Sequence, residues 1–200
     1  MFISMADKVP EGSLGKAIIK HFTIGPIGEE ISALRAIIQN DPDEALGQGS
    51  YCQLFVDGVL MMSDTPMEHR TNVEVVDRAH GYVFIAGLGI GMILIPILQK
   101  PEVTKVTVVE KSQDVIDLVG PNFTNPKLEI VCADVYNYIP QTGTKYDTIY
   151  FDIWPNLSSY ELRDMERLHK RYQKYRAVGG WMESWKRKEL RKRLARRLRK

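Results

Sequence analysis

Three alternating glycines interrupt an apolar run in the stretch VFIAGLGIGMIL. They are Gly87, Gly89 and Gly91. Glycine tolerates positive φ angles and has no Cβ, so a ligand can approach the backbone closely at such a turn. If a helix follows the turn, its first N–H groups and partial positive charge favour an anionic group. The stretch predicts a ligand-binding loop, although a tight packing turn would contain the same glycines.

Three carboxylates stand where later apolar runs end. Glu110 lies about 20 residues beyond the glycines, and Asp134 and Asp152 close two further runs. A carboxylate at Glu110 can accept hydrogen bonds from both hydroxyls of a ribose. Each acid alone is also typical of a solvated strand end or a helix cap. Taken together with the glycines, the three acids favour a shared binding edge.

The elements that must position these residues alternate in type. Strands are predicted at 83–86, 103–110, 128–133, 148–153 and 177–185, and helices at 92–99, 112–119, 135–139 and 158–175. Such alternation is typical of a parallel sheet covered on both faces. We therefore predict an α/β fold with a Rossmann-like, doubly wound and mostly parallel sheet. Ligands bind such a sheet at the carboxyl ends of its strands, where the glycines and the acids fall.

The segment before this core is predicted to be β-rich. Two apolar runs joined by Asp57-Gly58 predict a β-hairpin at 51–62, because this dipeptide readily adopts the positive φ angles of a two-residue turn. The other elements expected here are a strand at 16–24, a short helix at 31–40 and a helix in the second half of 63–81.

The glycine pattern departs from the dinucleotide fingerprint, whose third glycine would replace Met92. G-x-G-x-G instead resembles the first motif of the class I S-adenosylmethionine (SAM)-dependent methyltransferases. This resemblance implies SAM as the cofactor, with the acid at Asp134 contacting the adenine amino group. The residues assigned to cofactor binding are Gly87, Leu88, Gly89, Gly91, Glu110, Lys111, Asp134 and Val135.

A narrower resemblance covers roughly residues 51–185. The stretches QLFVDGVLMMSD, VTVVEKSQDVIDLVGPNF, LEIVCADVYNYI and YDTIYFDIWP are together similar to the spermidine synthases and their relatives. Aminopropyltransferases of that group carry aspartates where this chain has Ile90 and Trp154, and their Tyr-His-Glu cluster is not reproduced by TPMEHRTN, although His69 lies nearby. Polyamine nitrogens need such carboxylates, because a buried ammonium without a counter-charge is costly.

We therefore expect a methyltransferase that acts on a small-molecule substrate not identified by the sequence. Asp152 is the candidate base, since methyl transfer needs an aligned nucleophile and sometimes removal of its proton; it could instead cap the next helix. Trp154 and Tyr150, with Tyr136 as an alternative, are candidate substrate-binding residues, because aromatic rings hold flat or cationic groups. Two alternatives stay open: an aminopropyltransferase with a divergent polyamine pocket, and a non-catalytic SAM-binding module. No metal-ligand spacing occurs, so no metal site is predicted.

The charge of the chain is strongly divided. Its net charge is +2, yet residues 186–200 contain ten Lys or Arg and only one acid, Glu189, which leaves residues 1–185 acidic. Leu190, Leu194 and Leu198 recur at helical spacing. This basic helix either contacts nucleic acid or another polyanion, or docks on the acidic body of the chain. We divide the chain into a β-hairpin region at 1–80, a Rossmann-like SAM-binding core at 81–185 and a basic helical tail at 186–200.

The composition is that of a soluble globular protein. No apolar run reaches the roughly 20 residues that span a bilayer, and residues 1–10 lack a signal-peptide pattern, so a cytoplasmic protein is expected. Cys52 and Cys132 lie far apart, and Cys132 is expected to be a small buried hydrophobe. The chain ends soon after its last predicted strand, where the resembling family adds a hairpin. This would leave an open sheet edge or face that the basic helix or a second subunit must cover, and we expect a homodimer.

Overall fold

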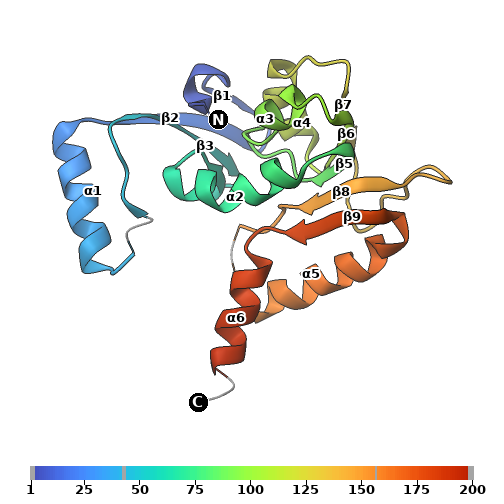
Figure 1. Ribbon diagram of the computed structural model, residues 1–200. Helices are drawn as coiled ribbons and strands as arrows, with labels where there is room; N and C mark the ends of the chain where they lie inside the picture. The colour runs from blue at the N-terminus through green and yellow to red at the C-terminus, as the bar shows by residue number, and fades with distance from the viewer. Residues whose placement is uncertain (1–2, 42–43, 156, 198–200) are drawn as a thin grey trace.

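The computed structural model of the protein describes residues 3–41, 44–155 and 157–197. An antiparallel sheet and a parallel sheet form its two main parts (Figure 1). The antiparallel sheet has the order β1-β2-β3-β4, with β1 at Gly12–Leu14, β2 at Ala17–Ile24, β3 at Gly49–Val56 and β4 at Val59–Ser63. The parallel sheet has the order β7-β6-β5-β8-β9, with β5 at Gly81–Ala86, β6 at Val103–Glu110, β7 at Leu128–Cys132, β8 at Tyr146–Phe151 and β9 at Arg176–Ser184. The helices are α1 at Pro26–Ile38, α2 at Pro66–Arg78, α3 at Leu94–Gln99, α4 at Gln113–Val119, α5 at Ser159–Tyr172 and α6 at Arg187–Arg197.

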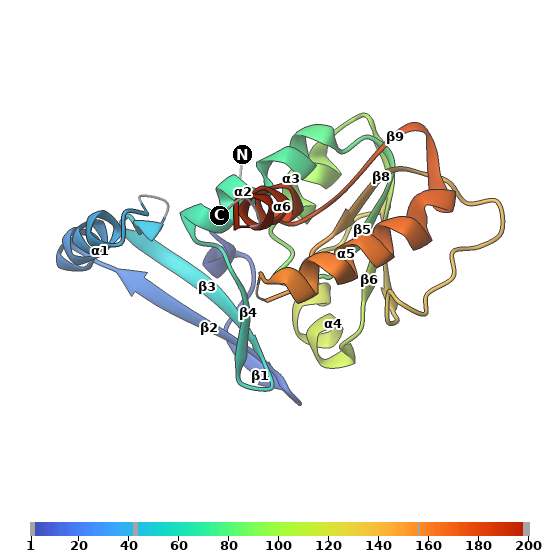
Figure 2. The same cartoon turned by 90° about the horizontal axis from the view of Figure 1, so that it is seen from below.

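The predicted α/β, Rossmann-like fold is confirmed, because every strand pair of the five-stranded sheet is parallel. Side chains alternate along the central strand β5. Val83 and Ile85 pack in one core cluster with residues of α2, α3 and α4. Phe84 and Ala86 pack in the other cluster with residues of α5 and α6. Figure 2 shows α5 lying across one face of the sheet, so both faces are covered.

Two local predictions in the core are wrong. Residues 135–137 form a turn, and no helix is present at 135–139; the Asp134 carboxylate accepts a hydrogen bond from the backbone N–H of Tyr136 at 2.8 Å. A side chain that bonds its own backbone in this way competes with helix formation. Cys132 is exposed rather than buried, because it ends the edge strand β7.

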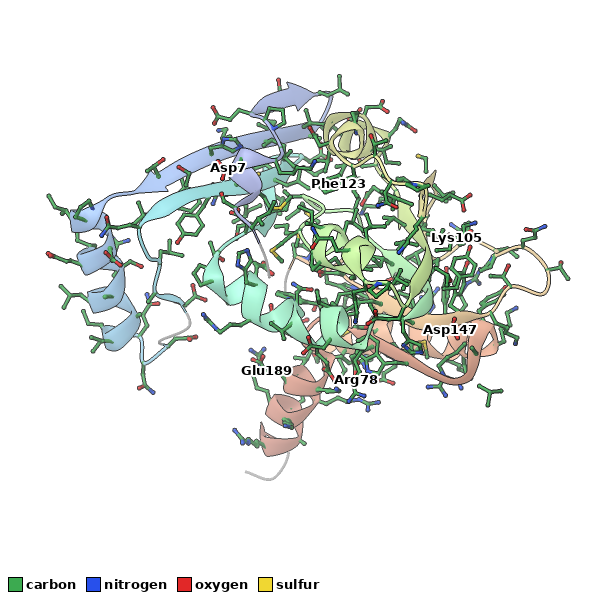
Figure 3. All side chains as sticks on the ribbon, turned by 45° about the horizontal axis from the view of Figure 1, so that its top comes forward. Asp7, Arg78, Lys105, Phe123, Asp147 and Glu189 are labelled. Atoms are coloured by element: carbon green, nitrogen blue, oxygen red, sulfur yellow. The ribbon has the colours of Figure 1, made fainter. Side chains whose placement is uncertain are left out.

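The predicted hairpin is confirmed as β3 and β4, with Asp57 and Gly58 at positive φ in the turn. It belongs to a larger, four-stranded sheet that contacts the core through α4. The backbone N–H of Lys16, in the turn between β1 and β2, donates to the Asp114 carboxylate at 2.8 Å. Figure 3 shows Asp7 near Phe123 on this side of the molecule, and the ammonium of Lys8 lies 5.7 Å from the Phe123 ring.

The described part of the basic tail docks on the chain itself. Leu190 of α6 is buried against the core cluster that contains α5 residues, whereas Leu198 lies outside the described residues. Arg187 and Arg191 both pair with Glu166 of α5, and Arg187 also pairs with Glu183. These contacts agree with docking on acidic groups of the body. Among the described helices, none is long and apolar enough to cross a membrane.

One buried carboxylate joins the N-terminus to the antiparallel sheet, and its loss should be measurable. The two oxygens of Asp64 accept hydrogen bonds from the backbone N–H groups of Met5 and Cys52, both at 2.6 Å. Asp64→Ala leaves both donors unpaired, so we expect the free energy of unfolding to fall by about 3 kcal/mol in urea titrations. Asp7→Ala, at an exposed acid nearby, should change it by less than about 0.5 kcal/mol. Equal effects of the two variants would contradict this role.

Candidate functional site

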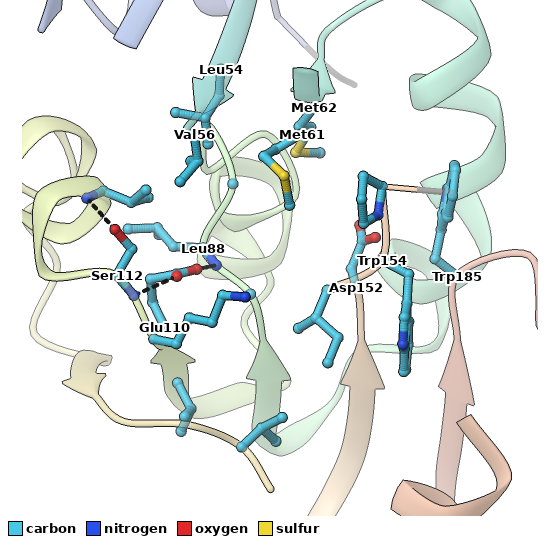
Figure 4. Close-up of a pocket in the computed structure, with 18 of the residues that line it drawn as sticks. Leu54, Val56, Met61, Met62, Leu88, Glu110, Ser112, Asp152, Trp154 and Trp185 are labelled. Atoms are coloured by element: carbon cyan, nitrogen blue, oxygen red, sulfur yellow. Dashed lines mark hydrogen bonds between the residues drawn. The ribbon is translucent and has the colours of Figure 1, made fainter. Parts of the chain in front are cut away.

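A cavity of about 460 Å³ lies at the carboxyl ends of the parallel strands, beside the β3–β4 hairpin (Figure 4). Its walls come from the segments that follow β5, β6, β7, β8 and β9, from the hairpin and from α2. This is the edge at which open α/β sheets hold their ligands, and the volume is typical of a small-ligand site. Within the described residues, no group of three or more His, Cys, Asp or Glu side chains is arranged to hold a metal ion.

The structure brings most of the sequence-predicted site residues together around this cavity. Those that line it are Gly87, Leu88, Gly89, Glu110, Lys111, Asp134, Val135, Asp152 and Trp154. Tyr136, the alternative to Tyr150, also lines it.

Two predicted residues do not reach the cavity wall. A Cβ on Gly91 would overlap the ring of Phe123, so this glycine permits close packing behind the loop. Tyr150 is buried, and its hydroxyl donates to the Asn72 side-chain oxygen at 2.9 Å. Both residues therefore support the site from outside its lining.

The glycine loop is shaped by close approaches from two other segments. Gly87 and Gly89 have φ angles of 96° and 53°, in the left-handed region that favours glycine. A Cβ on Gly87 would overlap the carbonyl oxygen of Asp152, and one on Gly89 would overlap the sulfur of Met62. Glycine at these positions therefore lets the end of β8 and the hairpin approach the loop.

Glu110 fixes this loop from the neighbouring strand. Its Oε2 accepts a hydrogen bond from the Leu88 backbone N–H, and its Oε1 accepts one from the Ser112 N–H, each at 2.9 Å (Figure 4). A carboxylate offers about four acceptor positions. Glu110 therefore keeps acceptor capacity for hydroxyl groups of a ligand in the cavity that it lines.

Asp134 provides a second acceptor beside apolar side chains. Its carboxylate is oriented by the Tyr136 N–H, as described above, and Val135 lies next to it in the cavity wall. Met92, Ile93 and Val115 add apolar surface to the lining. The chemistry of Glu110, Asp134 and these apolar groups fits the ribose and base of a nucleoside.

The other side of the cavity carries two acids with unusual pKa values. Burial raises the pKa of Asp152 to about 7. Burial, and then the negative charge of Asp152, raise the pKa of Glu68 to about 8, while Lys186 acts in the opposite direction. Acids that titrate near neutral pH in a cavity are suited to moving a proton or holding a cation.

Two indole rings lie beside these acids. Figure 4 shows Asp152, Trp154 and Trp185 on the side of the cavity away from Glu110. The indole N–H of Trp154 donates to Asp164 and that of Trp185 donates to Thr71, each at 3.0 Å. Both rings are therefore held in fixed orientations.

Sequence reasoning missed several of the lining residues, of which Glu68, Trp185, Met61 and Met62 matter most. Pro66 is typical of the first turn of a helix and indicates that Glu68 stands in that turn. That signal does not show where the helix packs. Only the tertiary arrangement brings Glu68 near Asp152.

Comparison with solved structures relates this arrangement to known proteins. Spermidine synthase from Thermotoga maritima aligns with a TM-score of 0.55 at 20% sequence identity, over 87% of this chain and 55% of that one. Spermidine synthase in complex with the transition state analogue AdoDATO aligns with a TM-score of 0.55 at 21% identity, over 87% and 54% of the two chains. SAM-bound CalS10, an amino pentose methyltransferase from Micromonospora echinaspora, aligns with a TM-score of 0.45 at 16% identity, over 58% and 49%.

The chain spans about half the length of these solved proteins. No protein-family model matches the sequence, and no match was found among curated proteins. The likeness to spermidine synthase therefore concerns the fold. The chain has a Rossmann-like α/β fold that is similar, over 87% of its length, to the fold of these spermidine synthase structures.

Proposed function

We propose that this protein is a SAM-dependent transferase that methylates an amine nitrogen. The observation that carries the proposal is the acid pair Asp152 and Glu68, which lies in the same cavity as the glycine loop and Glu110. One side of the cavity suits a nucleoside, and the other suits a basic acceptor. A transferase needs both sites next to each other.

The residues on the nucleoside side fit SAM. Glu110 would accept hydrogen bonds from the two ribose hydroxyls, and Asp134 would accept one from the adenine amino group. Gly87 and Gly89 would let the ligand approach the loop backbone, with Leu88, Lys111 and Val135 around it. When bound, SAM supplies an electrophilic methyl group on a sulfonium centre.

The acid pair supports an amine acceptor. An ammonium nitrogen has no free electron pair, so it must lose a proton before it can attack the methyl carbon. The ionised Asp152 carboxylate would take that proton. Glu68, whose pKa is raised to about 8, would provide a hydrogen-bond acceptor beside it through its carboxyl oxygen. Trp154 and Trp185 would offer ring faces to the cation before it is deprotonated.

Methyl transfer is favoured over aminopropyl transfer by the glycine loop. Ile90 is buried in the core, so the loop has no carboxylate at the position where aminopropyltransferases carry one. Aminopropyl transfer is the second candidate. The sequence lacks the aspartates that hold a polyamine nitrogen in aminopropyltransferases, but Glu68 places another carboxyl group in the cavity. The two reactions use different forms of the cofactor.

Calorimetric titration can separate the two reactions. We expect SAM and S-adenosylhomocysteine to bind, and decarboxylated SAM to bind at least about tenfold more weakly, a difference of about 1.4 kcal/mol. NADH serves as the control, because the third glycine of the dinucleotide fingerprint is absent. A preference for decarboxylated SAM would establish the aminopropyl alternative. Failure of all three sulfur compounds to bind would contradict the proposed function.

Glu110 should be essential for cofactor affinity. Glu110→Gln removes the charge and leaves only one oxygen to accept bonds from the loop and from the ribose. We expect the dissociation constant for SAM to rise about 10- to 100-fold, as loss of a charge-assisted hydrogen bond predicts. Glu129→Gln is the matched control, because Glu129 lies on β7 outside the cavity and pairs with Lys105. Equal affinities in the two variants would argue against a ribose site.

Asp152 should control turnover without controlling cofactor binding. With methyl-labelled SAM and with putrescine and spermidine as first acceptors, Asp152→Asn should lower kcat about 10²- to 10⁴-fold. The affinity of this variant for SAM should stay within about twofold of the wild-type value, because an asparagine side chain fills nearly the same space as aspartate. Asp77→Asn, at an exposed acid, is the control.

The same experiment has a pH dependence with a defined sign. A raised pKa keeps Asp152 protonated, and so unable to act as a base, in mildly acidic solution. The wild-type rate should therefore rise with pH through about 7 and then level off. Asp152→Asn should lack this step, and its residual rate should follow only the free-base fraction of the amine. An unchanged kcat in the variant, with SAM still bound, would favour the non-catalytic alternative.

A further inference from the structure

Helix α1 carries an apolar stripe that no other part of the described chain covers. Ile27, Ile31, Leu34 and Ile38 are 74%, 46%, 59% and 82% exposed. Their spacing of four, three and four residues places all four within about 60° of one another around the helix. Ile37, which is 74% exposed, widens the stripe at its C-terminal end.

The opposite face of α1 attaches the helix to the protein. Ala36 is buried there, and the hydroxyl of Ser32 accepts a hydrogen bond from the Leu46 N–H at 2.8 Å. Glu29 accepts one from the Gln48 side chain at 2.6 Å. These contacts fix the helix so that the stripe faces outward. Figures 1 and 2 both show α1 at the end of the antiparallel sheet, away from the parallel sheet.

An outward stripe of this kind is typical of a helix that pairs with another helix. Apolar residues spaced four and three apart form the seam of a coiled coil. Soluble proteins rarely leave several large apolar side chains in one exposed patch. We propose that α1 is the docking surface for a second copy of this chain, and that the two α1 helices pair in parallel about a two-fold axis.

Two charges beside the stripe select both the partner and the direction. Glu30 and Arg35 are exposed and lie on opposite flanks of the stripe, five residues apart. In a parallel pair, Glu30 of each copy faces Arg35 of the other, which gives two ion pairs of opposite charge. In an antiparallel pair with the same seam, each flank would face the same flank of the other copy. Glu30 would then lie against Glu30, and Arg35 against Arg35, so like charges would repel. The surface is therefore complementary to itself in the parallel arrangement.

The first test measures the mass of the full chain by sedimentation over a range of concentrations. We expect a dimer whose dissociation constant rises at least about 100-fold in Ile31→Glu, because each seam position is used twice in the dimer. Ile139→Glu is the matched control, since Ile139 is also an isoleucine with 72% exposure but lies outside α1. A monomeric wild type, or a dimer that persists in Ile31→Glu, would overturn the proposal.

The second test uses charge exchange to determine the direction of pairing. Glu30→Arg and Arg35→Glu should each weaken the dimer, and an equimolar mixture of the two variants should associate at least tenfold more tightly than either alone. The double variant should recover wild-type association. Leu34→Cys, made with Cys132→Ser to remove the exposed native thiol, should form a disulfide between two copies on oxidation. Absence of that disulfide and of recovery by mixing would reject parallel pairing.

Discussion

The site depends on the hydrogen bonds that the Glu110 carboxylate accepts from Leu88 and Ser112. These bonds join the loop after β5 to the loop after β6, and they pair two backbone N–H groups that would otherwise lack an acceptor at the cavity. They can form only because β5 and β6 are parallel neighbours whose carboxyl ends coincide. On the other side of β5 lies β8, and the backbone N–H of Asp152 donates to the Ala86 carbonyl at 2.9 Å. The strand order therefore opens a crevice with Glu110 on one side and Asp152 on the other.

Much of this arrangement could be predicted because it follows from local patterns. Apolar runs indicated the strands. The start of the predicted helix at 112–119 is marked by Ser112, whose hydroxyl caps α4 by accepting from the Val115 N–H. The rule that parallel strands bind ligands at their carboxyl ends then placed Glu110, Asp134 and Asp152 at one edge. The rule does not say which face of the sheet a side chain within a strand points to. Side chains alternate along β8, so the position of Tyr150 near the strand end did not establish that it reaches the cavity. Tyr150 faces the α2 side of the sheet, whereas Ile149 and Phe151 face the α5 side.

The residues that could not be predicted come from segments far apart in the chain. Glu68 and Asp152 line the same cavity only because α2 and the antiparallel sheet pack against the parallel sheet. That packing rests on contacts such as the one between Lys16 and Asp114, which no local pattern specifies. The hairpin itself was predictable from Asp57-Gly58. Its place beside the glycine loop, with Met62 next to Gly89, was not.

The docking of the basic tail also bears on the acid pair. Arg187 pairs with Glu183 and Glu166, and these ion pairs anchor the start of α6 directly after Trp185 and Lys186. The ammonium of Lys186 lies 5.1 Å from the Trp185 ring, and its charge lowers the pKa of Glu68 against the effect of burial. Burial and the charge of Asp152 alone would hold Glu68 more firmly in its protonated form. The first residue of the tail, Lys186, therefore keeps the pKa of Glu68 closer to neutral pH. The tail thus takes part in the electrostatics of the cavity and also presents a positively charged surface.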